Sequence, residues 1–266
     1  NSALIGAYSG ETVTITGNTA IGAQAMRYLG AGGYNTAIGD SALQGAAASA
    51  GSNNAQMNVA VGRATLTNIT DGDYNVAIGH FSLNALTTAD SNIGIGNDSL
   101  RALTTAGSNV AIGHQAMLVH TTGGDNIAIG SAAIGDTNAG STSLGSVQNI
   151  AIGTGTLGGT WADAASNYNI GIGKFVMDAV MNGAEHNIGI GQYSLSALTE
   201  GDDNTAIGHS ALGNVTTGNF NVGIGDRAGV NVTTGTNNIH LGYLAGYGGN
   251  TTGNVAIGSE ALFSCA

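Results

Sequence analysis

Histidine side chains recur at one position of this sequence, directly after a glycine that closes a repeated five-residue motif. The examples are His80, His114 and His209. A column of imidazoles on stacked repeats would make a transition-metal site. No two of these histidines belong to consecutive repeats, because Asn97 occupies the equivalent position between the first two. We therefore expect solvent-facing or packed histidines and no metal site.

Two acidic turns raise the separate question of calcium. They are Asp71-Gly72-Asp73 and Gly201-Asp202-Asp203. Calcium prefers clustered carboxylate and carbonyl oxygens, but neither turn matches the EF-hand loop or the nonapeptide calcium repeat. Aspartate and glycine are also ordinary turn residues. We expect no cofactor here, with calcium at the turn aspartates as the alternative.

Catalytic residue sets are not recognisable. Gly153-Thr154-Gly155 is not followed by the Gly-Lys-Ser/Thr of a phosphate-binding loop. Serine and aspartate are too frequent for a Ser-His-Asp set to be identified by type alone. A glycan-degrading spike would need paired carboxylates in a groove, for which Asp163 and Glu185 are candidates. We expect that the protein is not an enzyme.

Composition excludes several classes of partner. The 266 residues include 46 glycines and no proline, only 8% are charged, and the net charge is −11. Five basic residues cannot form the Lys/Arg clusters that nucleic acid or anionic lipid requires. No segment approaches the ~20 apolar residues of a membrane span. Cys265 is the only cysteine, so a disulfide framework and a thiolate zinc site are excluded.

A repeated motif predicts the secondary structure that positions all these residues. The motif Asn-x-(Ala/Gly)-(Ile/Val/Leu)-Gly occurs fourteen times, usually seventeen residues apart, with His240 replacing the small residue once. A short fixed period indicates stacked coils. We predict an all-β-dominated parallel solenoid, a β-roll or β-helix, forming a single array of about fourteen coils over 1–266. The motif asparagines, which we expect to form a hydrogen-bonded ladder, are Asn18, Asn35, Asn58, Asn75, Asn92, Asn109, Asn126, Asn149, Asn169, Asn187, Asn204, Asn221, Asn238 and Asn254.

The repeat from Asn75 to Ser91 illustrates one coil. Side chains alternate along a strand, so Val76 and Ile78 share one face and Ala77 lies on the other. We expect the β-branched face to pack in the core and the small-residue face to meet another layer. Leu83 and Leu86 are three residues apart, a spacing that predicts a short helical turn in many coils.

Three coils are longer than the rest, at 39–62, 130–153 and 153–173. Insertions in a solenoid usually form outward loops on the binding face. The third contains Trp161, the only tryptophan, which we expect to be a surface contact. Aromatic residues that directly precede a motif asparagine are further candidates for surface contact; the interpretation that we favour is that each ring covers the rim of its own coil. These residues are Tyr34, Tyr74, Tyr168 and Phe220.

Threonine pairs recur in the turns, for example Thr87-Thr88 and Thr104-Thr105. A stacked threonine array would be an ice-binding surface. An ice-binding strand carries threonines at alternate positions, so that both point outward. Adjacent threonines beside a turn are more typical of one side chain bonding to the backbone, so ice binding is a less favoured function.

The NTAIG and NVAIG cores with small residues after them, as in Asn35–Leu43 and Asn204–Leu212, resemble the repeats of trimeric adhesin heads and phage tail fibres. The resemblance covers nearly the whole chain, on a slightly longer period than that of the adhesin heads. It implies a left-handed parallel β-roll that trimerises and acts in surface adhesion. No site residues are carried over, because the motif is specific for architecture rather than function.

These observations predict a structural fibre segment of a phage tail fibre or surface adhesin. We expect a homotrimer that buries the small-residue face and presents contacts to a host or cell-surface receptor, with glycans among the candidates. The expected location is the virion or the cell surface. The alternative is a structural subunit of an extracellular filament that polymerises through stacked coil ends. An ice-binding protein and a glycan-degrading spike are less favoured.

Overall fold

The computed structural model describes residues 2–49, 52–135, 145–161 and 164–264. Within these ranges the chain forms strands of three residues separated by turns, and one 3-10 helical turn, η1 (Ala47–Ser49), in the longer coil between 39 and 62. Parts of the longer coils at 130–153 and 153–173 lie outside the described residues. The strands are β1 (Ala3–Ile5), β2 (Thr19–Ile21), β3 (Thr36–Ile38), β4 (Val59–Val61), β5 (Val76–Ile78), β6 (Ile93–Ile95), β7 (Val110–Ile112), β8 (Ile127–Ile129), β9 (Ile150–Ile152), β10 (Ile170–Ile172), β11 (Ile188–Ile190), β12 (Thr205–Ile207), β13 (Val222–Ile224), β14 (Ile239–Leu241) and β15 (Val255–Ile257).

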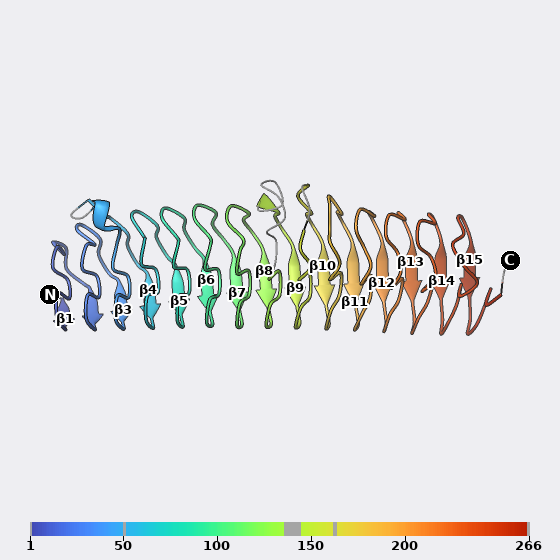
Figure 1. The fold of residues 1–266 in the computed structure, drawn as a ribbon, viewed down its shortest axis with the longest axis horizontal. Coiled ribbons are helices and arrows are strands. Elements are labelled where there is room, and N and C mark those ends of the chain that lie inside the picture. The colour runs from blue at the N-terminus through green and yellow to red at the C-terminus, as the bar shows by residue number, and fades with distance from the viewer. Residues whose placement is uncertain (1, 50–51, 136–144, 162–163, 265–266) are drawn as a thin grey trace. The chain divides into compact units, whose positions relative to one another are not determined.

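The array divides into two compact units, Asn1–Asn126 with β1–β7 and Ile127–Ala266 with β8–β15. Within each unit every strand pairs in parallel with the equivalent strand of the next coil (Figure 1). The register is direct, as between β5 and β6, where Val76 lies beside Ile93 and Ile78 beside Ile95. Each coil therefore repeats the backbone hydrogen bonds of the previous one. This confirms the predicted all-β parallel solenoid with about seventeen residues per coil.

The predicted helical turn after the strand is wrong. Phe81 and Leu83 have φ values of 54° and 50°, whereas a right-handed helix needs negative φ at every residue. The amide of Leu83 donates to the carbonyl of Ser99 in the next coil at 3.0 Å, and that of Ala85 donates to Arg101 at 3.1 Å. The backbone bonds between coils replace those that a helix would make within one coil. Leu83 and Leu86 are nevertheless fully buried.

The expected assignment of the strand faces is also wrong. Ala77 is fully buried inside the coil, whereas Ile78 is 37% exposed. The interior opposite a strand is already filled, mainly by the turn of the preceding coil. A Cβ added to Gly94, at the centre of β6, would lie 2.6 Å from Oγ of Ser82 and 3.2 Å from Cγ of Leu83. Even a methyl group at Gly94 would require Ser82 to shift, and other strand centres such as Ala77 hold no more than that methyl group, so the β-branched residues point outward.

The motif glycine is required by stacking. Gly79 has φ of 125°, a conformation that side chains disfavour. A Cβ at this position would overlap the carbonyl oxygen of Gly96, the equivalent glycine of the next coil. The glycine column thus lets successive coils approach to the strand spacing of ~4.8 Å.

Candidate functional site

The motif asparagines form a buried hydrogen-bonded ladder in each unit. Nδ2 of Asn92 donates to Oδ1 of Asn75 at 3.2 Å and to the carbonyl of Ala106 at 3.1 Å. The backbone amide of Asn92 also donates to Oδ1 of Asn75, at 2.9 Å. The same side-chain bonds connect Asn18 through Asn126 in the first unit and Asn149 through Asn254 in the second. These amides bond to the chain itself and offer little to a ligand.

The turn aspartates serve as hydrogen-bond acceptors for the preceding coil. Oδ1 of Asp73 accepts from the amide of Gln56 at 2.7 Å, and Oδ1 of Asp202 accepts from the amide of Glu185 at 2.8 Å. Asp90 accepts in the same way from the amide of Asp73. No group of three or more His, Cys, Asp or Glu side chains within the described ranges is placed to hold a metal ion. The acidic turns therefore have a structural role in the stack.

In the threonine pairs Thr87-Thr88 and Thr104-Thr105, one side chain bonds to the backbone of the next coil, as predicted, and the other is exposed. Oγ1 of Thr87 donates to the carbonyl of Thr104 at 3.1 Å, and Oγ1 of Thr104 donates to that of Thr121 at 3.1 Å. The second threonine of the pair, Thr88 or Thr105, is exposed. Only one exposed threonine column results, because the first of each pair bonds to the neighbouring coil.

The candidate carboxylates of a glycan-degrading spike are not assembled by the described residues. Asp163 lies outside them. Oε1 of Glu185 accepts a hydrogen bond from Nδ2 of Asn167 at 2.8 Å. Burial raises the pKa of a different acid, Asp178, against the opposing effect of a hydrogen bond with its own backbone. Because Asp163 lies outside the described residues, the pairing of these two carboxylates stays a prediction.

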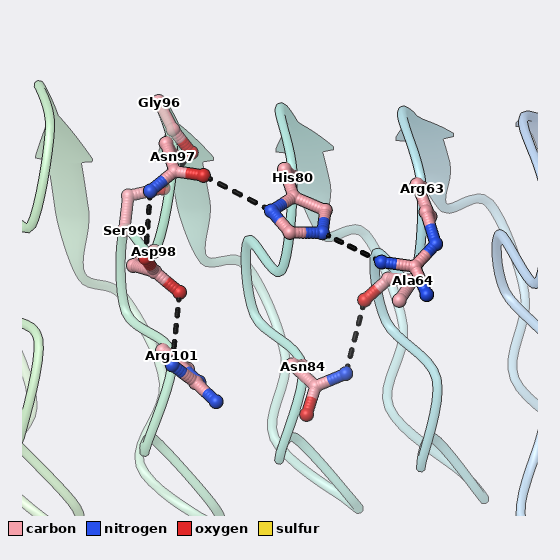
Figure 2. Close-up of polar contacts among 9 residues, drawn as sticks. All are labelled: Arg63, Ala64, His80, Asn84, Gly96, Asn97, Asp98, Ser99 and Arg101. Carbon is pink, nitrogen blue, oxygen red and sulfur yellow. Dashed lines mark hydrogen bonds and ion pairs between the residues drawn. The ribbon is translucent and has the colours of Figure 1, made fainter.

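His80 belongs to a row of polar side chains on neighbouring coils, here called the polar ladder (Figure 2). Its Nδ1 lies 3.1 Å from Oδ1 of Asn97, and its Nε2 lies 3.0 Å from Nη1 of Arg63. The amide oxygen can only accept and the guanidinium can only donate. The contacts therefore assign a neutral imidazole with its proton on Nδ1, bonded on both sides.

The polar ladder continues into two ion pairs and an aromatic ring. Asp98 accepts from Nδ2 of Asn97 at 2.6 Å and from Nη1 of Arg101 at 3.1 Å. The guanidinium of Arg101 lies 4.9 Å from the ring centre of Phe81, and that of Arg63 lies 5.8 Å from it. Arg63 also lies 3.7 Å from Asp40. Both arginines of the polar ladder therefore have a carboxylate nearby.

A shallow groove runs beside the polar ladder across three coils of the first unit. Its volume is about 380 Å³, and its lining is mainly apolar with Arg101 in the wall. The other lining residues are Asn84, Ala85, Ala102, Leu118 and Val119. The other two histidines that follow a motif glycine, His114 and His209, do not line this groove. His114 is exposed, and Nδ1 of His209 is 3.6 Å from Asp226.

Trp161, expected as a surface contact, is fully buried. It is the largest side chain of the interior, and its Nε1 has no hydrogen-bond partner among the described residues. An indole supplies far more apolar area than the small residues around it in the sequence, so burial is favoured over exposure. The prediction of a surface contact at Trp161 is wrong.

The aromatic residues before the motif asparagines are exposed, as a surface contact requires. The exposed fractions are 64% for Tyr34 and 45% for Tyr168, and Tyr74 and Phe220 are similar. One face of two rings is covered by a neighbouring coil. Tyr168 stacks on His186 at 4.9 Å, and the ring of Tyr34 lies against the backbone of Gly17. The expected role in receptor contact remains a prediction.

The outward residues of the strands form an extended apolar surface, here called the outer sheet face. In the first unit the last strand position contributes Ile21, Ile38 and Ile78, and in the second unit Ile152, Ile172, Ile207 and Ile224. All seven are between 37% and 40% exposed. The first strand position adds a row of half-buried threonine, valine and isoleucine. We expected these side chains in the core, and so missed this surface.

Comparison with protein-family models, curated proteins and solved structures finds no significant match for this chain. Over its described part, no helix has the length and apolar character that crossing a membrane would require.

Proposed function

We propose that the chain is a structural segment of a phage tail fibre or surface adhesin, which assembles with copies of itself and presents contacts to a host or cell surface. The outer sheet face carries this proposal. A row of isoleucine at the last strand position, beside a row of valine, isoleucine and threonine at the first, remains partly in water. Soluble monomers rarely leave such contiguous apolar strips uncovered, and burying them is favourable by ~25 cal/mol per Å².

Copies of the same chain fit this face because of its geometry. Within each unit the rows run across neighbouring strands, and they repeat with the strand spacing. A second copy in the same orientation would place an apolar row against an apolar row at every coil. The fifteen three-residue strands contain no Asp, Glu, Lys or Arg, so assembly would bury no charge from them.

A trimer is the assembly that we favour. The outer sheet face is only two side-chain rows wide, and three such narrow faces can converge on one axis to form a closed core. The earlier reason for a trimer, burial of the alanine and glycine face, no longer applies, because that face is buried within one chain. The resemblance to trimeric adhesin heads agrees with three copies.

The role in presenting contacts rests on stiffness and repetition. The asparagine ladder connects each coil to the next within each unit, and threonine side chains bond to the backbone of the next coil in several places. Groups such as the partly exposed Phe81 with its two arginines, and the exposed Tyr74, would be displayed once per chain. Three chains would then multiply weak contacts through avidity.

An extracellular filament subunit is the second candidate. It is favoured by the near-identity of successive coils, which would let the strand bonds and the asparagine ladder continue from one copy to another. Growth of this kind gives open polymers rather than a closed particle.

The native mass distinguishes these assemblies. Light scattering on the purified chain should give a particle of three times 26.0 kDa. An unheated SDS gel should retain the same species, because the apolar rows are shielded from detergent. A stable monomer would contradict both candidates, and polymers without a fixed size would favour the filament.

A further inference from the structure

One strand centre of the second unit holds a residue unlike its equivalents. The central residue of a strand points into the coil and is alanine or glycine in all described strands except β1, with Leu4, and β14, with His240. The imidazole of His240 is 1% exposed. A titratable ring therefore occupies the interior of a stack that otherwise accepts only hydrogen or methyl at this position.

Space for the ring comes from two glycines. The position four residues after the motif glycine is leucine in many coils, as at Leu83, but it is Gly229 and Gly246 around His240. A Cβ on Gly229 would lie 2.8 Å from Cδ2 of His240, and one on Gly246 would overlap the ring. Leucine tolerates the same left-handed φ elsewhere in the array, so the glycines are needed here for volume.

An internal precedent shows that this exchange of large and small residues is a packing solution. Leu4 replaces the small residue in β1, and Gly10 replaces leucine in the same coil. A Cβ on Gly10 would lie 2.6 Å from Cδ1 of Leu4. Leu4 lies in the first coil and is 41% exposed, so it is a precedent for the exchange itself, at a more open position than that of His240. Histidine adds a group that can take up a proton.

The site offers that ring little polar compensation. Neither Nδ1 nor Nε2 of His240 has a hydrogen-bond partner among the described residues. A cavity of about 10 Å³ beside the ring has room for about one water molecule. It is lined by His240, Gly246, Gly248, Gly249, Thr251, Asn254 and Leu262. None of these lining side chains other than His240 itself can carry a charge.

Titratable and charged groups on the elements packed against His240 point elsewhere. The turns that follow β12–β15 carry His209, Asp226, Arg227, Tyr243, Tyr247 and Glu260, all at least partly exposed. Burial alone lowers the pKa of His240, without a contribution from any of these groups. A proton on the buried ring would therefore have neither a counter-charge nor bulk water to stabilise it.

We propose that His240 makes the coils of β13–β15 an acid-labile joint, which opens on protonation of the ring while β8–β11 stay folded. This inference is independent of the proposed function. The pKa of the ring lies below its ordinary value of 6.5 in the closed coil and returns to that value on opening. The stability of the joint is therefore complete above about pH 6.5 and is lost as the pH falls. Each pH unit favours opening by up to tenfold, until the closed coil also takes up the proton.

Hydrogen exchange followed by mass spectrometry tests the joint in the intact chain, near pH 7.5 and near pH 5. After correction for intrinsic exchange rates, acid should increase the opening constant of peptides from β13–β15 by about tenfold or more, and leave β8–β11 unchanged. His240→Leu should abolish the acid response, because leucine has no titrating group and Gly229 and Gly246 leave room for its side chain. His209→Gln, at an exposed histidine of the same unit, should keep it.

A second variant covers the case in which His240→Leu does not fold. His240→Ala combined with Gly229→Leu and Gly246→Leu restores the arrangement common to other coils. It should also lack the acid response. An unmodified chain whose β13–β15 coils stay closed in acid, or a folded His240 variant that opens like the unmodified chain, would overturn the proposal.

Discussion

Oδ1 of Asn75 accepts two hydrogen bonds from Asn92 in the next coil, one from the backbone amide at 2.9 Å and one from Nδ2 at 3.2 Å. A single side-chain atom thus ties together the backbone and the side chain of its neighbour. Both groups are buried, so neither bond is replaced by water when it is lost. The ladder is therefore a main determinant of coil stacking.

Replacing one ladder asparagine should destabilise its unit strongly. Asn92→Ala leaves the amide of Asn109 without its acceptor and the carbonyl of Ala106 without its donor. Buried unpaired groups cost about 1–3 kcal/mol each, so we expect a loss of about 3 kcal/mol in unfolding free energy, measured by urea denaturation. Asn68→Ala, at an exposed asparagine with one bond to Asn84, should cost less than about 1 kcal/mol. Equal effects of the two changes would contradict the role given to the ladder.

Alanine substitutions at two motif glycines distinguish the free-energy cost of disturbed stacking from that of a strained backbone. Gly79→Ala introduces a Cβ that overlaps the carbonyl of Gly96, whereas a Cβ at Gly258 meets no atom within 4 Å. Both residues have positive φ, 125° and 118°. Strain of about 1–2 kcal/mol is common to both, and overlap adds about 1–3 kcal/mol at Gly79 alone. The midpoint temperature of thermal unfolding should therefore fall much further for Gly79→Ala than for Gly258→Ala. Similar decreases in the two variants would exclude the stacking explanation.

The period of the stack, the strand register and the bonding between asparagines are readable from the sequence, because identical residues recur at the separation that stacking requires. The helical turn was a wrong prediction, since the spacing of Leu83 and Leu86 suits both a helix and turns whose φ alternates in sign. The outward direction of Ile78 was missed because alternation along a strand does not say which face is inside. The space left inside the coil decides which face is inside, and that space depends on residues of the neighbouring turns.

Trp161 provides an optical test of the interior. It is the only tryptophan in the sequence, and its indole is fully buried. Fluorescence of the native protein should be blue-shifted and poorly quenched by iodide, because water and ions do not reach the ring. Denaturant should shift the emission to the red and restore quenching. Native emission like that of a solvated indole would place Trp161 on the surface after all.

Calcium should not affect stability. The carboxylates of Asp73 and Asp202 accept backbone hydrogen bonds from the preceding coils instead of facing a common cation. We expect the same melting temperature with calcium and with a chelator. A calcium-dependent rise that disappears in Asp73→Asn or Asp202→Asn would show that these turns bind the ion.

The central claim is that copies of the chain meet through the outer sheet face. Ile78→Glu combined with Ile95→Glu puts charges into that face, whereas Thr88→Glu combined with Thr105→Glu puts the same charges at exposed positions of the same two coils. Native mass by light scattering is the most direct measurement. The account predicts that the isoleucine variant falls to a 26.0 kDa monomer while the threonine variant keeps three times that mass. An isoleucine variant that keeps the mass of the unmodified assembly would contradict it.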